Sequence, residues 1–161
     1  GISFKEITNY SNECNRRIKF ENMKLFPDAL PLIKKLKGKF LLTTLANVPD
    51  SVAHEKVLRT TSLKEHFHFH FDSITTGTRK PNKKIFRLVL NHFKVKPIEA
   101  VMVGDSPSAD IRGGNNLGMH TILINRNGIK YSFTELTKPD FEISSLKQLP
   151  KVLKKLENKS K

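Results

Sequence analysis

The segment Ala100–Gly118, AVMVGDSPSADIRGGNNLG, constrains the fold more than any other part of the sequence. Ala100–Val103 is a short apolar run typical of a fully buried strand, and it ends in Gly104 and Asp105. A helix is expected to follow, with Asp110 in its first turn. Because the carboxyl ends of parallel strands form the binding crevice of an open α/β sheet, we expect both aspartates on one rim of such a crevice.

Asp105 and Asp110 have two interpretations. Two carboxylates with the spacing D-x-x-x-x-D suit a hard divalent cation such as Mg²⁺. Aspartate is also a common turn and helix-capping residue, so both side chains could serve the backbone alone. The remainder of the chain has to decide between the two.

Alternating strand and helix patterns along the 161 residues predict one α/β domain with its own core. Turn and capping residues separate the expected elements. Helices are expected over 26–36, 49–58, 83–93 and 149–156, after Asp105, and more weakly over 7–20. Strands are expected over 39–45, 71–76, 100–103, 119–124 and 140–143, and Ser145 with Gln148 resembles a capping box.

Two features favour a cytoplasmic protein. No apolar run approaches the roughly 18 residues that span a bilayer, and the first five residues do not open a signal peptide. The single cysteine, Cys14, cannot form an intramolecular disulfide, which fits a reducing interior.

The net charge of +14 raises the question of nucleic-acid binding. Residues 77–97 contain seven basic residues and no acidic one. Several of these polar residues recur at helical spacing, however, and few aromatic residues are interleaved with them, which indicates the solvated face of an amphipathic helix. We interpret the charge as favouring solubility and anionic substrates, and nucleic-acid binding as the lesser alternative.

Lys80, Asn47 and Asp105 each stand at the carboxyl end of a different expected strand. A strand-end lysine can neutralise a phosphoryl group and a carboxylate nucleophile. Thr43, Thr44 and Asn47 can donate hydrogen bonds to the same phosphoryl oxygens. Hydroxyl, amide, ammonium and carboxylate groups on neighbouring strand ends predict metal-assisted phosphoryl transfer or hydrolysis.

Two further patterns have simpler explanations. His66, His68 and His70 alternate with phenylalanines, so they could share one face and bind a metal. We favour a strand start with the phenylalanines inward and the histidines in water. Gly113 and Gly114 lie within the helix after Asp110 and so predict close helix packing on the sheet, not a phosphate loop.

From about Leu25 to Leu156 the sequence resembles the haloacid dehalogenase-like (HAD) hydrolase superfamily, in the branch with a small helical cap. Residues 103–110, VGDSPSAD, followed by Leu117–Gly118–Met119, are similar to the fourth motif of that family. Residues 79–86, RKPNKKIF, are similar to the third motif. The order and spacing of the two motifs carry the resemblance.

The resemblance implies a Rossmann-like three-layer sandwich with a parallel sheet. It implies that Asp105 binds Mg²⁺, that Asp110 supports the metal or orients Lys80, and that Lys80 holds the phosphoryl group and the nucleophile. Asn47 takes the second motif's phosphate-binding position. Ala46 stands where the family has Ser or Thr, so the hydroxyl role passes to Thr44 or is absent.

The first motif of the family, a central strand that ends in D-x-D, has no match before Leu25. Its loss would leave two buried strand edges unpaired, so we expect that strand from an N-terminal segment or from a second chain. Residues 1–24 are then a remnant of the cap, 25–157 the core domain and 158–161 a loose tail. A continuous sheet formed by this chain alone would contradict this expectation.

These observations together predict an Mg²⁺-dependent phosphatase for small phosphorylated metabolites, with an aspartyl nucleophile outside this chain. The chain alone is expected to be inactive. The dehalogenase branch fits less well, because its chemistry uses no metal and a carboxylate pair is present here. The alternative is a non-catalytic module that keeps the fold and binds a metal or a partner.

Overall fold

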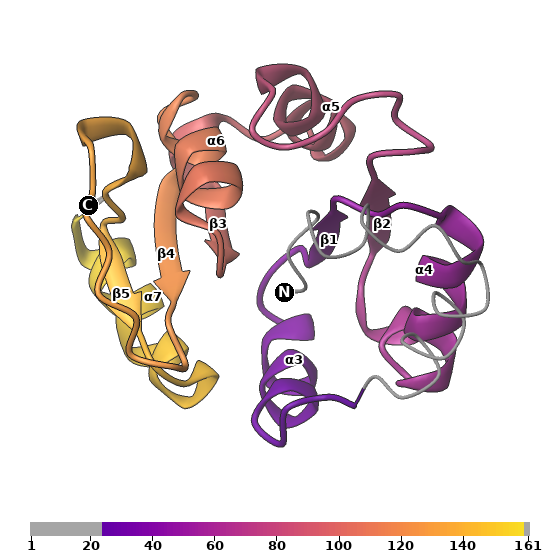
Figure 1. Ribbon diagram of the computed structural model, residues 1–161. Helices are drawn as coiled ribbons and strands as arrows, with labels where there is room; N and C mark the ends of the chain where they lie inside the picture. The colour runs from indigo at the N-terminus through magenta and orange to yellow at the C-terminus, as the bar shows by residue number, and fades with distance from the viewer. Residues whose placement is uncertain (1–23, 160–161) are drawn as a thin grey trace. The chain divides into compact units, whose positions relative to one another are not determined.

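The structure, a computed structural model, describes residues 24–159 (Figure 1). The helix expected over 7–20 lies outside the described residues. The described part of the chain forms two compact units, which we call unit 1 (residues 24–79) and unit 2 (residues 80–159). None of the described helices is long and apolar enough to cross a membrane.

Unit 1 contains a parallel two-stranded sheet with helices before and between its strands. In the register of the sheet, Ala46 lies opposite Asp72, so the two strands end together. Leu32, Leu58 and Phe71 contribute to the buried core. The elements are α3 (Ala29–Lys37), β1 (Thr43–Ala46), α4 (Ser51–Thr60) and β2 (Phe69–Asp72).

The predicted bounds of the strand over 71–76 were wrong, because β2 begins at Phe69 and ends at Asp72. The Asp72 carboxylate accepts hydrogen bonds from the backbone N–H groups of Ile74 (2.9 Å) and Thr75 (2.8 Å). These bonds turn the backbone away from the sheet immediately after Asp72.

The expectation of inward phenylalanines and solvated histidines was correct for Phe71, which is 7% exposed, and for the exposed His68. It was wrong for Phe69, which is 42% exposed, and for His70, which is half-buried. His70 is held by hydrogen bonds at both ring nitrogens.

Unit 2 contains a parallel three-stranded sheet in the order β3-β4-β5. Ile122 and Leu123 of the central strand β4 are fully buried. The structure confirms the α/β class with parallel sheets, and α5 has the bounds that the sequence predicts. The elements are α5 (Lys83–Phe93), β3 (Val101–Gly104), α6 (Arg112–Asn115), β4 (His120–Ile124), β5 (Phe141–Ile143) and α7 (Leu149–Lys159). The capping box of Ser145 and Gln148 is present.

Gly113 and Gly114 allow α6 to pack closely, as predicted. A Cβ atom at Gly114 would lie 2.7 Å from Thr121 Cγ2 of β4 and 3.3 Å from Met102 Cβ of β3. A Cβ atom at Gly113 would lie 2.1 Å from the ring of Phe86. Gly114 thus faces the sheet, whereas Gly113 makes room for α5.

The expectation that β3 is fully buried was wrong, since all four residues of Val101–Gly104 are only half-buried. Within the described residues β3 pairs with β4 alone, and β1 pairs with β2 alone. The described residues therefore form two sheets, and the mostly apolar strand β3 lies at the edge of the sheet in unit 2. The additional central strand that the resemblance implies stays a prediction.

Candidate functional site

The candidate site of unit 2 lies at the carboxyl edge of its sheet. β3 ends at Gly104, and Asp105 follows it directly with an exposed side chain. A strand-end carboxylate in this position is accessible to ligands from solvent. The structure thus places Asp105 at the strand end where the sequence predicts it.

Asp110 is brought back towards the end of β3 by a π-helical turn, Pro107–Ile111, where the sequence predicts the first turn of an α-helix. The Ser106 carbonyl accepts hydrogen bonds from the N–H groups of Asp110 (2.8 Å) and Ile111 (3.2 Å), and the second bond makes the turn wider than an α-helical one. The Ser106 N–H donates in return to Asp110 Oδ2 at 3.0 Å.

Lys80 and Asp110 form a buried ion pair, with 2.6 Å between Lys80 Nζ and Asp110 Oδ1. Their side chains are 11% and 5% exposed. A Cβ atom at Gly104 would lie 2.3 Å from Asp110 Cγ, so only glycine leaves room for the carboxylate against the strand end. The structure therefore brings together two of the predicted site residues, and of the two roles considered for Asp110 this contact favours the orientation of Lys80.

The donor set fits Mg²⁺ through Asp105. Mg²⁺ binds proteins through one or two carboxylates and completes its octahedron with waters and substrate phosphates. Asp105 is the exposed carboxylate of the site, and both oxygens of Asp110 accept hydrogen bonds, one from Lys80 and one from the Ser106 N–H. The described residues contain no group of three or more His, Cys, Asp or Glu side chains that could hold a metal by themselves.

In unit 1 the predicted phosphate-binding residues lie in and after β1. Asn47 follows the last residue of the strand, whereas Thr44 lies within it. Both ring nitrogens of His70 are in hydrogen bonds: Nδ1 lies 3.0 Å from the Thr44 hydroxyl, and Nε2 lies 3.1 Å from the Lys64 carbonyl. The Thr44 hydroxyl thus has a hydrogen-bond partner within unit 1, and its contact with a phosphoryl group stays a prediction.

Asp72 is a buried carboxylate at the end of β2 that sequence analysis missed. It accepts hydrogen bonds from the Ser51 hydroxyl (2.9 Å) and two backbone N–H groups, and it lies 3.7 Å from His54 Nδ1. Burial raises the pKa of Asp72, but the hydrogen bonds from Thr75, Ser51 and Ile74 outweigh it and lower the pKa below its usual range. An aspartate between an apolar run and Ser-Ile-Thr-Thr is a turn signal that could have revealed it.

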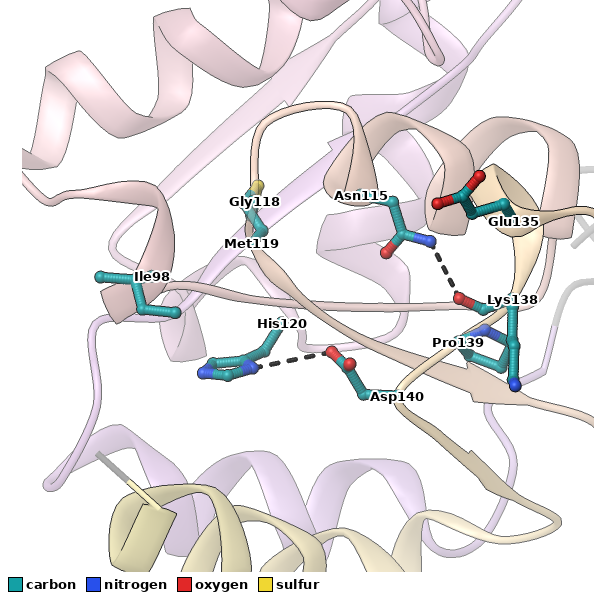
Figure 2. Close-up of a pocket in the computed structure, with 9 residues that line it drawn as sticks. All are labelled: Ile98, Asn115, Gly118, Met119, His120, Glu135, Lys138, Pro139 and Asp140. Carbon is teal, nitrogen blue, oxygen red and sulfur yellow. Dashed lines mark hydrogen bonds and ion pairs between the residues drawn. The ribbon is translucent and has the colours of Figure 1, made fainter. Parts of the chain in front are cut away.

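A separate pocket of about 590 Å³ lies at the amino edge of the sheet in unit 2 (Figure 2). His120 is the first residue of β4, and its Nδ1 lies 3.6 Å from Asp140 Oδ2 beside the start of β5. The Asn115 amide donates to the carbonyls of Leu136 and Lys138, both at 2.9 Å. Asp105 lies at the opposite, carboxyl edge, so this pocket is distinct from the candidate site.

Several curated relatives of the chain are named as phosphatases. The chain is 36% identical over 143 residues to the glyceraldehyde 3-phosphate phosphatase of Methanopyrus kandleri, covering 86% of this chain and 60% of the relative. It is 30% identical over 146 residues to the human N-acylneuraminate-9-phosphatase, covering 88% and 56%. The chain thus spans little more than half the length of these relatives.

Solved structures agree with the fold. A HAD-hydrolase of Bacillus subtilis, YfnB, whose crystal structure was determined bound to magnesium, matches with a TM-score of 0.79 and 31% identity, over 86% of this chain and 60% of that one. A HAD phosphatase of Thermococcus onnurineus matches with a TM-score of 0.78 and 28% identity, over 93% and 68%.

The family itself follows from the match of residues 4–118 to the family described as haloacid dehalogenase-like hydrolase. The matched region includes Lys80, Asp105 and Asp110, which are the residues of the candidate site in unit 2. The chain belongs to the haloacid dehalogenase-like hydrolase family.

Proposed function

We propose that the protein is an Mg²⁺-dependent phosphatase that acts on a small phosphorylated metabolite. The observation that carries this proposal is the buried Lys80–Asp110 ion pair beside the exposed carboxylate of Asp105 at the end of β3. A cation and a separate carboxylate at one strand end suit a substrate that brings both negative charge and metal-binding oxygens.

Each residue has a stated role in this proposal. Asp110 holds the ammonium group of Lys80, which neutralises a phosphoryl oxygen and the attacking carboxylate. Asp105 holds the metal, and the Asn47 amide donates to a phosphoryl oxygen. Bound Mg²⁺ supplies charge stabilisation at the phosphoryl group and orients it.

The nucleophile is proposed to be an aspartate at the end of a further strand. Such a strand would come from an N-terminal segment or from a second chain. Its carboxylate attacks phosphorus, the alcohol leaves with a proton, and water then hydrolyses the phosphoaspartate to release phosphate. The half-buried strand β3, which is mostly apolar and has one strand partner among the described residues, supports the presence of a further strand.

The substrate class is supported by the relatives and by charge. The relatives are named for glyceraldehyde 3-phosphate, phosphoserine and N-acylneuraminate 9-phosphate, which are all small phosphate esters. A net charge of +14 also attracts anionic substrates over distances comparable to the Debye length.

The test is hydrolysis of an aryl phosphate by the full-length protein, measured with and without Mg²⁺. We expect Asp105→Asn to lower kcat/KM by about 100-fold or more, the scale of losing one group that stabilises charge in the transition state. The matched control is Asp140→Asn, which changes a carboxylate at the opposite edge of the same sheet and keeps an oxygen for the Thr121 N–H.

Two results would overturn the proposal. If the Asp105→Asn variant kept full Mg²⁺-dependent activity, Asp105 would not hold the metal. If the full-length protein hydrolysed no phosphate ester, the non-catalytic alternative would replace the phosphatase. Equal losses in the Asp105 and Asp140 variants would indicate a general effect of removing a carboxylate.

A further inference from the structure

Ser73 contacts the backbone on both sides of Asn47. Its N–H donates to the Ala46 carbonyl at 3.0 Å. Its hydroxyl accepts a hydrogen bond from the Val48 N–H at 3.0 Å and donates one to the Val48 carbonyl at 3.1 Å. Ser73, the first residue after β2, therefore bonds to Ala46 and Val48. These are the two chain neighbours of Asn47.

We propose that Ser73 is a positioning residue that fixes the backbone around Asn47 and thereby aims the Asn47 side chain. This inference rests on the proposed contact of Asn47 with a phosphoryl oxygen. Ser73 itself needs no contact with the substrate. It acts by setting the direction in which the chain leaves β1.

The burial of Val48 explains why this hydroxyl matters. Val48 is 9% exposed, so water has little access to its backbone groups. Backbone N–H and C=O groups that are buried need protein partners. Because the Ser73 hydroxyl serves as donor and acceptor at once, it satisfies both groups of Val48 with a single oxygen. Alanine in its place would leave both without this partner.

Asp72 forms a hydrogen bond with the other end of the same segment, at Ser51. Its ionised carboxylate accepts from the hydroxyl of Ser51, the first residue of α4, at 2.9 Å. Asp72 and Ser73 thus bracket the connection from Ala46 to Ser51, in whose first half Asn47 lies. A loop held at both ends keeps a functional side chain within the narrow range of positions that catalysis requires.

The experiment is a double-mutant cycle on the full-length protein with an aryl phosphate as substrate. In the parent, Ser73→Ala is expected to lower kcat/KM by about 10-fold or more, since displacements near 1 Å cost up to about 100-fold. In the Asn47→Ala background the same change should cost less than about twofold, because Ser73 acts through Asn47. Ser73→Thr, which keeps the hydroxyl, should recover most of the activity.

Thr61→Val is the matched control. It removes another hydroxyl hydrogen bond in unit 1, from Thr61 to the Val57 carbonyl at 2.6 Å, and is expected to leave kcat/KM unchanged. A second measurement, amide hydrogen exchange, does not depend on activity. Ser73→Ala should accelerate exchange at the Val48 amide, and Thr61→Val should not.

The outcomes separate this inference from the proposed function. Unchanged kcat/KM in the Asn47→Ala variant would refute the phosphoryl contact and the positioning role built on it. A large effect of Asn47→Ala, with an equal effect of Ser73→Ala in both backgrounds, would overturn only the inference about Ser73. Unaltered exchange at Val48 in the Ser73→Ala variant would show that Ser73 does not hold this segment.

Discussion

The two sheets differ in how completely they bury apolar residues. In unit 2 the central strand β4 has a partner on each side, and its residues Ile122 and Leu123 are 0% exposed. In unit 1 each strand has one partner within the described residues, and Phe69 of β2 is 42% exposed. Apolar sequence is present in both sheets. The strand β4, with partners on both sides, thus buries Ile122 and Leu123 completely, whereas on β2, with one described partner, Phe71 is 7% exposed and Phe69 remains accessible.

The ion pairs that join a lysine or arginine to a carboxylate also differ in exposure between the two units. In unit 2 the Lys80–Asp110 pair is almost completely buried. In unit 1 Glu55 is 39% exposed and pairs with Lys64 and Arg59. Hydrogen bonds from Lys64 first, and then from Arg59, lower the pKa of Glu55. Solvent screens the exposed pairs, so the two sets of ion pairs should contribute differently to stability.

The largest expected effect comes from breaking the buried pair. Asp110→Ala leaves the ammonium of Lys80 buried without its partner, which typically costs about 3–5 kcal/mol. Glu55→Ala is the matched change at an exposed pair, with an expected cost of at most about 1 kcal/mol that falls further in salt. Urea denaturation of both variants measures the difference, and equal losses would contradict the contrast between the units.

A second contrast uses one glycine from each unit. Gly113→Ala in unit 2 places a Cβ atom 2.1 Å from the Phe86 ring, and overpacking of this kind costs about 1–3 kcal/mol. Gly38→Ala in unit 1 meets no atom within 4 Å at φ −84°, so we expect a change within about 0.5 kcal/mol. Thermal unfolding of the two variants checks this. A neutral Gly113→Ala would show that α6 and α5 can separate without loss.

Local patterns in the sequence predicted the elements that are determined locally. The bounds of α5 follow from Asn82, whose side chain accepts a hydrogen bond from the Lys84 N–H, and from an apolar stripe at helical spacing. The placement of Asp105 directly after an apolar strand followed from the sequence in the same way.

Long-range contacts account for most of what the sequence did not predict. The half-burial of β3 depends on which strands pair with it, and no pattern within Val101–Gly104 contains that information. The bond between Thr44 and His70 depends on the register of β1 against β2. Likewise, the double contact of Ser73 with Val48 joins residues 25 positions apart.

The smallest expected effect is a pH dependence specific to unit 1. Burial lowers the pKa of His54 below its ordinary value of 6.5, although the neighbouring Asp72 opposes this shift. Below about pH 6.5 the unfolded chain therefore binds a proton that the folded chain does not, so stability is complete above that pH and declines as the pH falls towards the folded pKa. His54→Gln should remove this part of the decline. Hydrogen exchange of the β2 amides, corrected for intrinsic rates and compared between about pH 7.5 and pH 5.5, measures it. If the decline in stability were unchanged in the His54→Gln variant, another group would cause the pH dependence. The contrast between the two units would then rest on burial alone.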